Sequence, residues 1–250
     1  VYVEGEDWAE EKRVEINELK ERENYRRQLI GNLAHELKTP ISSIQGYILT
    51  LLEGGLEDEN VNREFLNRAS KGVDRLTSIV EDMDTITRLE EGVMQLDLNN
   101  MELSKLVDEA ISNLRLKAEK AGITISNSIP TGTIVVCDDA RMLQVFTNLL
   151  INAINYGNDG GRVDISSYPA EDRVMVEVSD DGIGIDSEHL PRLFERFYRV
   201  GSSRSRHKGG SGLGLAIVKH IIEAHGQSIS VVSAPEEGTR FTFSLQQGSA

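Results

Sequence analysis

Two amphipathic helical patterns separated by a glycine pair fill the first third of the sequence. The first has apolar residues at heptad a and d positions: Ile16, Leu19, Ile30, Leu33, Leu37, Ile44, Tyr47 and Leu51. The second alternates steps of four and three through Phe65, Ala69, Val73, Leu76, Val80 and Met83. Between them, Gly54-Gly55 supplies a helix C-cap and a turn so short that the two helices must run antiparallel.

A hairpin with one apolar stripe on each helix cannot bury both stripes by itself. A second copy that completes a four-helix bundle is the economical solution, so we expect a homodimer. The first helix is expected to stop near Glu53. The highly charged segment 6–27 keeps the heptad register and is interpreted as a coiled-coil lead that passes a rotation or tilt into this helix.

Residues 32–40, Asn-Leu-Ala-His-Glu-Leu-Lys-Thr-Pro, bring side chains that could take part in catalysis onto this helix. His35 falls at heptad position f, the outermost one, so its imidazole should be exposed to water and to a large partner. Thr39 lies one turn above His35 and also beside Glu36. A neutral imidazole is a competent nucleophile, and a neighbouring carboxylate can take its other proton. Pro40 removes a helical hydrogen bond, which predicts a kink.

Composition narrows the class of protein. The 250 residues, 39% hydrophobic and 27% charged, fit two small globular domains. A formal net charge of −14 argues against nucleic-acid binding, which depends on basic residues that neutralise phosphates. The single cysteine, Cys137, suits a reducing compartment and is expected to be a buried strand residue. We find no membrane-spanning run or signal peptide, and because the chain begins with Val we interpret it as a piece of a longer protein.

The residue pattern changes near residue 93, where we place a domain boundary. Helical periodicity returns in segments 103–114, 140–156 and 213–224. Between and after them lie segments of β character, at 123–125, 133–136, 162–168, 173–179, 228–233 and 239–245. This mixture of helices and antiparallel strands predicts an α+β domain with helices on one face of a sheet.

Two stretches of this second domain carry polar groups suited to a nucleotide. Helix 140–156 places Asn148, Asn152 and Asn155 at i, i+4 and i+7, on one face, and amide oxygens suit Mg²⁺. The stretch 180–184, Asp-Asp-Gly-Ile-Gly, follows a strand directly. Its glycines let the backbone approach a flat ligand, and its first carboxylate can accept from an exocyclic amine such as that of adenine.

Two further stretches are suited to phosphate. Segment 193–199 supplies aromatic rings and cations, and segment 209–215 is a glycine-rich turn that opens a helix, whose first amides and dipole favour phosphate. From residue 196 to residue 210 this acidic chain has no carboxylate but carries Arg196, Arg199, Arg204, Arg206 and Lys208. This local reversal of charge favours an anion site, and its Gly and Ser content suggests a mobile lid.

The box around His35 and these four stretches, in this order, resemble the sensor histidine kinases of two-component signalling. The resemblance covers about residues 30–247 and implies a multi-domain protein. Its parts would be a coiled-coil signalling linker (1–29), a helical hairpin for dimerisation and histidine phosphotransfer (30–93), and a Bergerat-type ATP-binding domain (94–250). It also implies the cytoplasmic part of a membrane-anchored sensor protein.

The resemblance implies roles for the residues of the first domain. His35 would accept the γ-phosphoryl group of ATP, and Glu36 would serve as its general base. The phosphoryl group would then pass to an aspartate in the receiver domain of a response regulator. Thr39 would orient water to hydrolyse the aspartyl phosphate.

The resemblance also implies the composition of the nucleotide site. Asn152 would bind Mg²⁺, helped by Asn148, and Asp180 would recognise the adenine amino group. The rest of the pocket would consist of Asn155, Tyr156, Gly182, Gly184, Arg199, Gly210, Gly212, Leu213 and Gly214.

One residue departs from the family pattern. Members often carry lysine at the position of Asn155, and that lysine touches phosphate. An amide brings no charge, so phosphate binding here would depend on Arg199 and the lid cations. Two alternatives to an autokinase therefore stay open: a protein that acts mainly as a phosphatase of its regulator through Thr39, and a non-catalytic ATP-binding dimer whose closure only signals.

Overall fold

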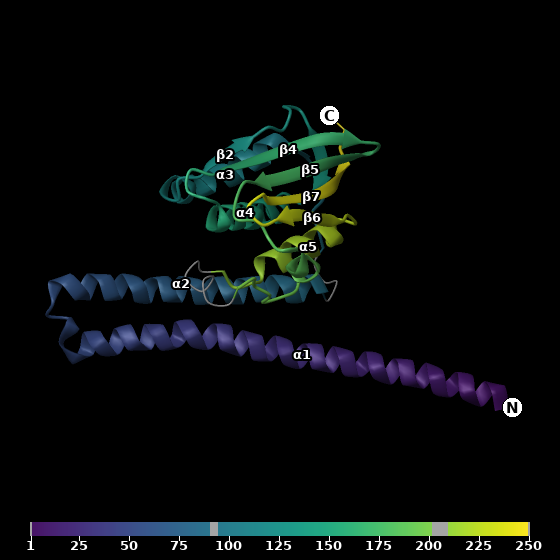
Figure 1. The fold of residues 1–250 in the computed structure, drawn as a ribbon, viewed down its shortest axis with the longest axis horizontal. Helices are drawn as coiled ribbons and strands as arrows, with labels where there is room; N and C mark the ends of the chain where they lie inside the picture. The colour runs from purple at the N-terminus through teal and green to yellow at the C-terminus, as the bar shows by residue number, and fades with distance from the viewer. Residues whose placement is uncertain (1, 91–94, 202–209, 250) are drawn as a thin grey trace. The chain divides into compact units, whose positions relative to one another are not determined.

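The computed structural model describes residues 2–90, 95–201 and 210–249. The chain divides into two compact units, Val1–Val80 and Glu81–Ala250 (Figure 1). The elements in chain order are α1 (Tyr2–Thr50), the π-helical turn η1 (Leu51–Gly55), α2 (Glu59–Glu90), β1 (Asn99–Glu102), α3 (Leu103–Lys120), β2 (Thr124–Asn127), β3 (Ile134–Cys137), α4 (Asp139–Tyr156), β4 (Arg162–Ala170), β5 (Arg173–Asp180), the 3₁₀ helix η2 (Ser187–Arg192), α5 (Gly214–Ala224), β6 (Ile229–Ala234) and β7 (Gly238–Gln247).

The first unit is an antiparallel hairpin of α1 and α2 (Figure 1). The turn begins in η1, where Gly54 has a φ of +117°, a backbone conformation that favours glycine. The predicted glycine turn between two antiparallel helices is therefore confirmed. Helix α1 continues through Pro40, whose ring is buried, and the kink at this residue stays a prediction.

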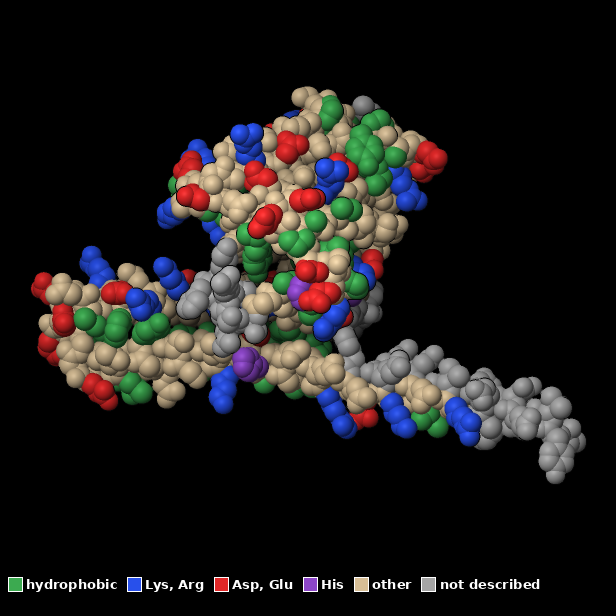
Figure 2. All heavy atoms as spheres, viewed as in Figure 1, with side chains coloured by type: hydrophobic (Ala, Val, Ile, Leu, Met, Phe, Trp, Pro, Cys, Tyr) green, Lys and Arg blue, Asp and Glu red, His purple; other side chains and the backbone are tan. Residues whose placement is uncertain are grey.

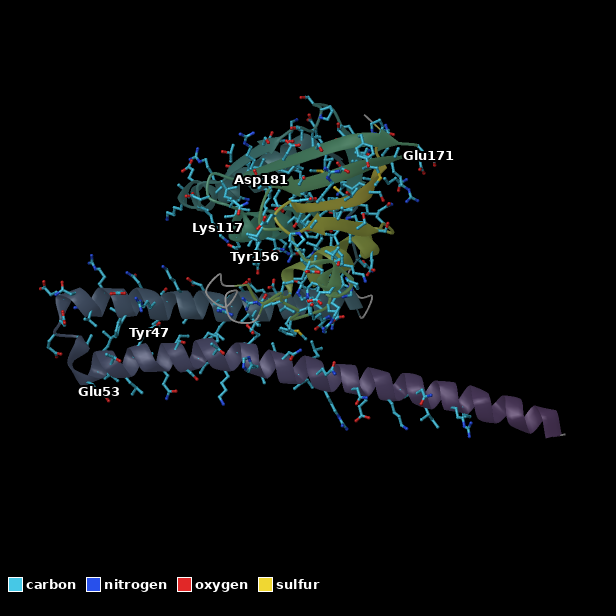
Figure 3. The ribbon with its side chains drawn as sticks, in the orientation of Figure 1. Tyr47, Glu53, Lys117, Tyr156, Glu171 and Asp181 are labelled. Carbon is cyan, nitrogen blue, oxygen red and sulfur yellow. The ribbon has the colours of Figure 1, made fainter. Side chains whose placement is uncertain are left out.

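The seam of the hairpin is held by aromatic and aliphatic contacts. Tyr47 of α1 points toward α2 (Figure 3), where its ring lies 5.4 Å from the ring of Phe65, measured between centroids. A Cβ atom on Gly72 would lie only 2.6 Å from Cγ1 of Ile44, so the helices approach each other closely at this glycine. Any larger residue there would push the two helices apart.

Many large apolar side chains of the hairpin are exposed, although most residues of the two predicted stripes are buried or half-buried. Figure 2 shows hydrophobic side chains reaching its surface, and the exposed ones are Ile16, Leu19, Ile30, Ile41, Ile48, Leu49, Leu52, Leu56, Leu66, Val73 and Val80. A shallow apolar groove among them is lined by Ile41, Ile44, Gln45, Ile48, Leu49 and Leu76. One copy of the hairpin therefore leaves this apolar groove uncovered. In the described residues no helix is both long and apolar enough to cross a membrane.

The second unit is built on a seven-stranded sheet with the order β1-β3-β7-β5-β4-β2, and β6 also pairs with β7. Strands β4 and β5 form the predicted hairpin, in which Ala170 pairs with Arg173 across a two-residue turn. Helices α3, α4 and α5 cover one face of the sheet (Figure 1), as predicted. The α+β architecture is therefore confirmed.

Three features of this unit differ from the expectation. Strands β2 and β4 pair in parallel, so the sheet is mixed rather than wholly antiparallel. Strand β1 was not expected, because its sequence Asn-Asn-Met-Glu has no apolar alternation; it is placed at the edge by backbone pairing with β3. The 3₁₀ helix η2 was also not expected, and Asp186 caps its start by accepting from the backbone N–H of Glu188.

The core lies between the sheet and its helices. Inward residues alternate along β5, with Val174, Val176 and Val178 buried, as expected for a sheet covered on one face. Cys137 is buried as predicted, and this burial raises the pKa of its thiol to about 12. The ring of Phe146, on α4, lies 5.9 Å from that of Phe243, on β7.

Truncation of the Phe146 side chain tests the packing of this core. It is fully buried, so Phe146→Ala should lower the free energy of unfolding by about 3–5 kcal/mol through lost burial and a residual cavity. Urea denaturation measures the change. The matched control is Leu116→Ala, because Leu116 is 65% exposed on α3 and its truncation should cost less than about 0.5 kcal/mol. Equal costs at both positions would contradict this core.

Candidate functional site

His35 lies exposed on α1, as its heptad position predicted. One turn further, the Thr39 hydroxyl donates to the His35 backbone carbonyl at 3.3 Å, which confirms that the two residues share a face of the helix. The imidazole is therefore open to a large partner, with a hydroxyl group one turn away.

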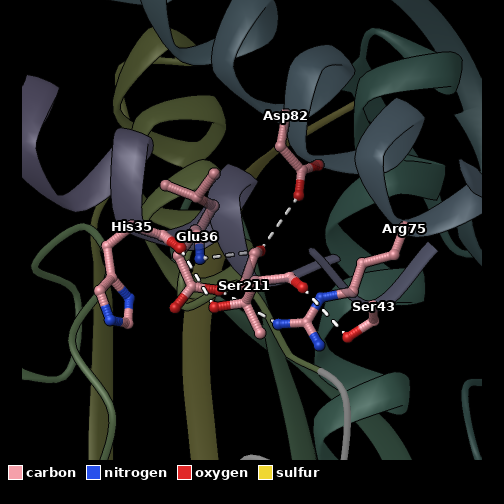
Figure 4. A network of polar contacts seen from close by, with 8 residues as sticks. His35, Glu36, Ser43, Arg75, Asp82 and Ser211 are labelled. Atoms are coloured by element: carbon pink, nitrogen blue, oxygen red, sulfur yellow. Dashed lines mark hydrogen bonds and ion pairs between the residues drawn. The ribbon is translucent and has the colours of Figure 1, made fainter. Parts of the chain in front are cut away.

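Glu36 follows His35 on α1 and pairs with a residue of α2. It is half-buried, and its Oε2 accepts from Nη2 of Arg75 on α2 at 3.1 Å, within the hairpin (Figure 4). This partner is not predicted by the local sequence pattern, because it is 39 residues away along the chain. Only the register of the two antiparallel helices brings the pair together, and that register is set by contacts such as Gly72 against Ile44.

In the second unit, α4 carries the asparagine stripe. The helix is capped by Asp138, whose side chain accepts from the backbone N–H of Arg141 at 3.0 Å. Asn148, Asn152 and Asn155 are all half-buried. The Nδ2 atom of Asn148 is buried and has no hydrogen-bond partner among the residues that the structure describes. A buried amide without a partner is costly, so this atom marks a place where a bound polar group fits.

The end of β5 meets the end of α4. Asp180 Oδ1 accepts from the backbone N–H of Gly182 at 2.9 Å, and the N–H of Ile183 donates to the carbonyl of Tyr156 at 3.2 Å. A Cβ atom on Gly182 would lie 2.7 Å from that same carbonyl. Figure 3 marks this region with Tyr156 and Asp181. The first two predicted stretches are thus in direct backbone contact.

Gly184 fixes the path of this turn. Its φ is +66°, and a Cβ atom there would lie 1.8 Å from the carbonyl oxygen of Ala234 on β6. Both conditions require glycine. The turn after β5 is therefore held against β6 as well as against α4.

The other two predicted stretches also meet. The backbone N–H of Phe197 donates to the carbonyl of Gly212 at 2.8 Å. A Cβ atom on Gly214, the first residue of α5, would lie 3.5 Å from the side-chain amide of Asn148. The glycine-rich turn therefore faces the asparagine stripe of α4. Leu213 is buried, whereas Arg199 and Gly210 are half-buried.

Part of the predicted basic segment lies outside the described residues, namely Arg204, Arg206 and Lys208. Within the description, Ser211 Oγ accepts from the backbone N–H of Leu213 and donates to Asp82 Oδ2 at 3.4 Å (Figure 4). Burial raises the pKa of the Asp82 carboxyl to about 6. This carboxylate was not predicted, because nothing in its helical pattern separates it from its acidic neighbours.

The types of side chain at this site determine which metal ion it could bind. Among the described residues no three His, Cys, Asp or Glu side chains gather where they could hold a metal ion. An ion at this site would therefore be held by amide oxygens and by the oxygens of a bound ligand, a combination that Mg²⁺ accepts. The unpartnered amide of Asn148 fits such a site.

Comparison with protein families finds two matches along the chain. A model described as "His Kinase A (phospho-acceptor) domain" matches residues 25–92, and one described as "Histidine kinase-, DNA gyrase B-, and HSP90-like ATPase" matches residues 137–249. A curated relative, the sensor-like histidine kinase SenX3 of Mycolicibacterium smegmatis, is 35% identical over 222 residues, which are 89% of this chain. The match spans only 58% of that relative's length.

Solved structures agree with the sequence matches. The Acinetobacter baumannii histidine kinase AdeS superposes with a TM-score of 0.70 at 27% identity, over 86% of this chain and 98% of that one. The histidine kinase ThkA, in complex with the response regulator protein TrrA, gives a TM-score of 0.70 at 25% identity, over 88% of this chain and 61% of that one.

The Asp180 carboxyl should make the folding stability of the second unit depend on pH. Burial raises the pKa of its carboxyl, although N–H groups of Gly182 and Thr239 oppose the shift by donating to it. A raised folded-state pKa means that this carboxyl stabilises the fold most when protonated, below its unfolded pKa, and that the stability is lost as pH rises through the folded pKa. Asp180→Asn, which does not titrate, should therefore gain stability relative to the parent as the pH rises from below the unfolded pKa of Asp180 through its raised folded pKa.

Urea denaturation across this pH range measures the difference. Asp172→Asn serves as the control for loss of one negative charge, because Asp172 is exposed in the turn between β4 and β5, and its effect is subtracted at each pH. A corrected difference that stays flat, or that favours the parent as pH rises, would contradict the burial of Asp180.

Proposed function

The chain belongs to the sensor histidine kinase family, and from that premise we propose that it is an ATP-dependent protein histidine kinase that phosphorylates itself on His35. The observation that carries this proposal is the pairing of two features in one chain. The first unit presents an exposed imidazole beside a carboxylate. In the second unit, four stretches suited to a nucleotide meet through backbone and side-chain contacts.

In this proposal the second unit binds ATP. Asp180 accepts a hydrogen bond from the adenine amino group, since its carboxyl is half-buried at the end of β5 and its other bonds come from backbone N–H groups. Asn152 ligates Mg²⁺, with Asn148 beside it on the same face of α4. When bound, the ion neutralises charge that develops on the phosphate oxygens. The first amides of α5 face the phosphates.

The proposed reaction balances on groups of this chain. One ring nitrogen of His35 attacks the γ-phosphorus, a P–N bond forms, the bond from phosphorus to the bridging oxygen breaks, and ADP leaves. The other ring nitrogen gives its proton to Glu36 as positive charge develops on the ring. Catalysis of this kind consists mainly of positioning and electrostatic stabilisation, which suits an exposed acceptor presented to a separate ATP-binding unit.

Two partners are proposed. The first is a response regulator whose aspartate takes the phosphoryl group from His35, a proposal supported by the ThkA structure solved with the regulator TrrA. The second is another copy of this chain, because the exposed apolar face of the hairpin needs a cover and a second hairpin supplies one of the same shape. We also propose that the parent protein is anchored in a membrane with this part in the cytoplasm.

A second activity at the same site is the hydrolysis of the regulator's aspartyl phosphate. The Thr39 hydroxyl is exposed one turn from His35, and its own hydrogen donates to a backbone carbonyl, which leaves its oxygen able to accept from a water molecule. Thr39→Ala should then reduce dephosphorylation of a labelled regulator more than it reduces labelling of His35.

The central test uses γ-labelled ATP and Mg²⁺. The parent chain should acquire a label that is stable in base and labile in acid, and the label should be absent from His35→Gln and reduced at least about a hundredfold in Asn152→Ala, because phosphoryl transfer depends on precise positioning. Asn113→Ala is the matched control, an exposed asparagine on α3. A label that persists in His35→Gln, or a parent that binds ATP without being labelled, would contradict the proposal.

Asn155 offers a gain-of-function test. A hydrogen bond to a charged donor is worth about 1 kcal/mol more than a neutral one, so Asn155→Lys should lower the KM for ATP about fivefold. Steady-state labelling at varied ATP concentration measures it. Asn113→Lys adds the same charge on an exposed face of α3 and should leave the KM unchanged. An unchanged KM in Asn155→Lys would mean that this position does not face the phosphates.

A further inference from the structure

Among the described residues of the hairpin, one ion pair joins the two helices next to the proposed phosphoacceptor His35. Nη2 of Arg75 lies 3.1 Å from Oε2 of Glu36, and the two side chains are 29% and 19% exposed. The other ion pairs described in this unit, Arg27 with Glu23 and Arg68 with Glu64, join residues four apart on one helix and are well exposed. The pair between Arg75 and Glu36 therefore differs from these in two ways: it joins two helices, and it is mostly buried.

The helix geometry explains why Glu36 needs a partner. Residues i and i+1 on a helix do not face each other, so Glu36 is not directed at His35 by the backbone alone. A glutamate side chain on a helix surface samples several rotamers, and each one that is lost on ordering costs free energy. A charge-assisted hydrogen bond from a fixed arginine selects among those rotamers.

Burial makes this selection strong. A charge pair with little solvent around it is screened less than a surface pair, and removing one partner leaves the other charge poorly solvated. The Nε atom of Arg75 is buried and has no hydrogen-bond partner in the described part of the chain. The guanidinium group is therefore confined by its surroundings, and among the described residues its side-chain hydrogen bond goes to Glu36.

We propose that Arg75 is a positioning residue for the reaction at His35: it holds one carboxylate oxygen of Glu36 and leaves the other oriented to take the imidazole proton. This inference rests on the proposed kinase function and deepens it. Arg75 does not touch the nucleotide or the reacting atoms in this scheme; it acts through Glu36. Because the pair spans α1 and α2, a rotation of one helix against the other changes the orientation of the base.

A double-mutant cycle tests the proposal on the whole chain. Initial rates of His35 labelling are measured at varied Mg²⁺-ATP for the parent, Arg75→Met, Glu36→Gln and the double variant. Arg75→Met should lower kcat roughly tenfold and leave the KM for ATP within about twofold, because general-base catalysis is impaired while the ATP site is untouched. In the Glu36→Gln background, Arg75→Met should have almost no further effect.

Two further variants serve as controls for a loss of folded structure. Arg75→Lys keeps a charged donor near Glu36 and should restore part of the lost rate, since a lysine can make a single bond although it lacks the fork of arginine. Arg63→Met removes an exposed arginine from the same helix and should leave the rate unchanged. If Arg75→Met does not fold, the cycle is run with Arg75→Lys, and the same dependence on Glu36 is expected.

The possible results distinguish the positioning role of Arg75 from the proposed kinase function. A labelled parent in which Arg75→Met slows the reaction by the same factor with Glu36 and with Gln at position 36 would overturn the positioning role and leave the kinase function standing. An unchanged or faster rate in Arg75→Met would do the same. A parent that binds ATP but is never labelled on His35 would overturn the kinase function, and the role of Arg75 with it.

Discussion

The close approach of backbone segments at the end of β5 is the constraint on which the proposed nucleotide site depends. A Cβ atom on Gly238 would lie 2.0 Å from the carbonyl oxygen of Asp180, and one on Gly184 would lie 1.8 Å from that of Ala234. These glycines bring β6, β7 and the turn after β5 together, and Gly182 adds the end of α4. Asp180 is half-buried because of this convergence, and the pKa of its carboxyl is raised for the same reason.

The chemistry is divided between two units with different physical character. The hairpin offers an exposed imidazole, a hydroxyl one turn away and a carboxylate held by an interhelical ion pair. The second unit offers a glycine-rich helix start against an amide stripe, in which one buried amide has no partner. Among the described residues, the proposed phosphoryl acceptor lies in one unit and the proposed phosphate-binding turn lies in the other. Phosphoryl transfer therefore requires one unit to present its acceptor to the other, and binding and positioning dominate such a reaction.

The local sequence pattern was enough to predict those features that depend only on neighbouring residues. The glycine turn at Gly54, the exposure of His35 and the hairpin between β4 and β5 all follow from periodicity and turn residues. What could not be predicted depends on contacts between distant segments. Strand β1 exists because β3 pairs with it, and Glu36 meets Arg75 only through the helix register. Likewise, the contact of Asp82 with Ser211 joins residues 129 apart in sequence.

The central claim is that the phosphoryl group is accepted at His35. Peptide mass spectrometry of the parent chain after reaction with Mg²⁺-ATP, with fragmentation that preserves P–N bonds and digestion kept at alkaline pH, tests it most directly. We expect a phosphoryl group on the imidazole of His35 and nowhere else in the peptide that contains Glu36 and Thr39. A phosphoryl group on Thr39, on a carboxylate, or on a histidine of the second unit would contradict it.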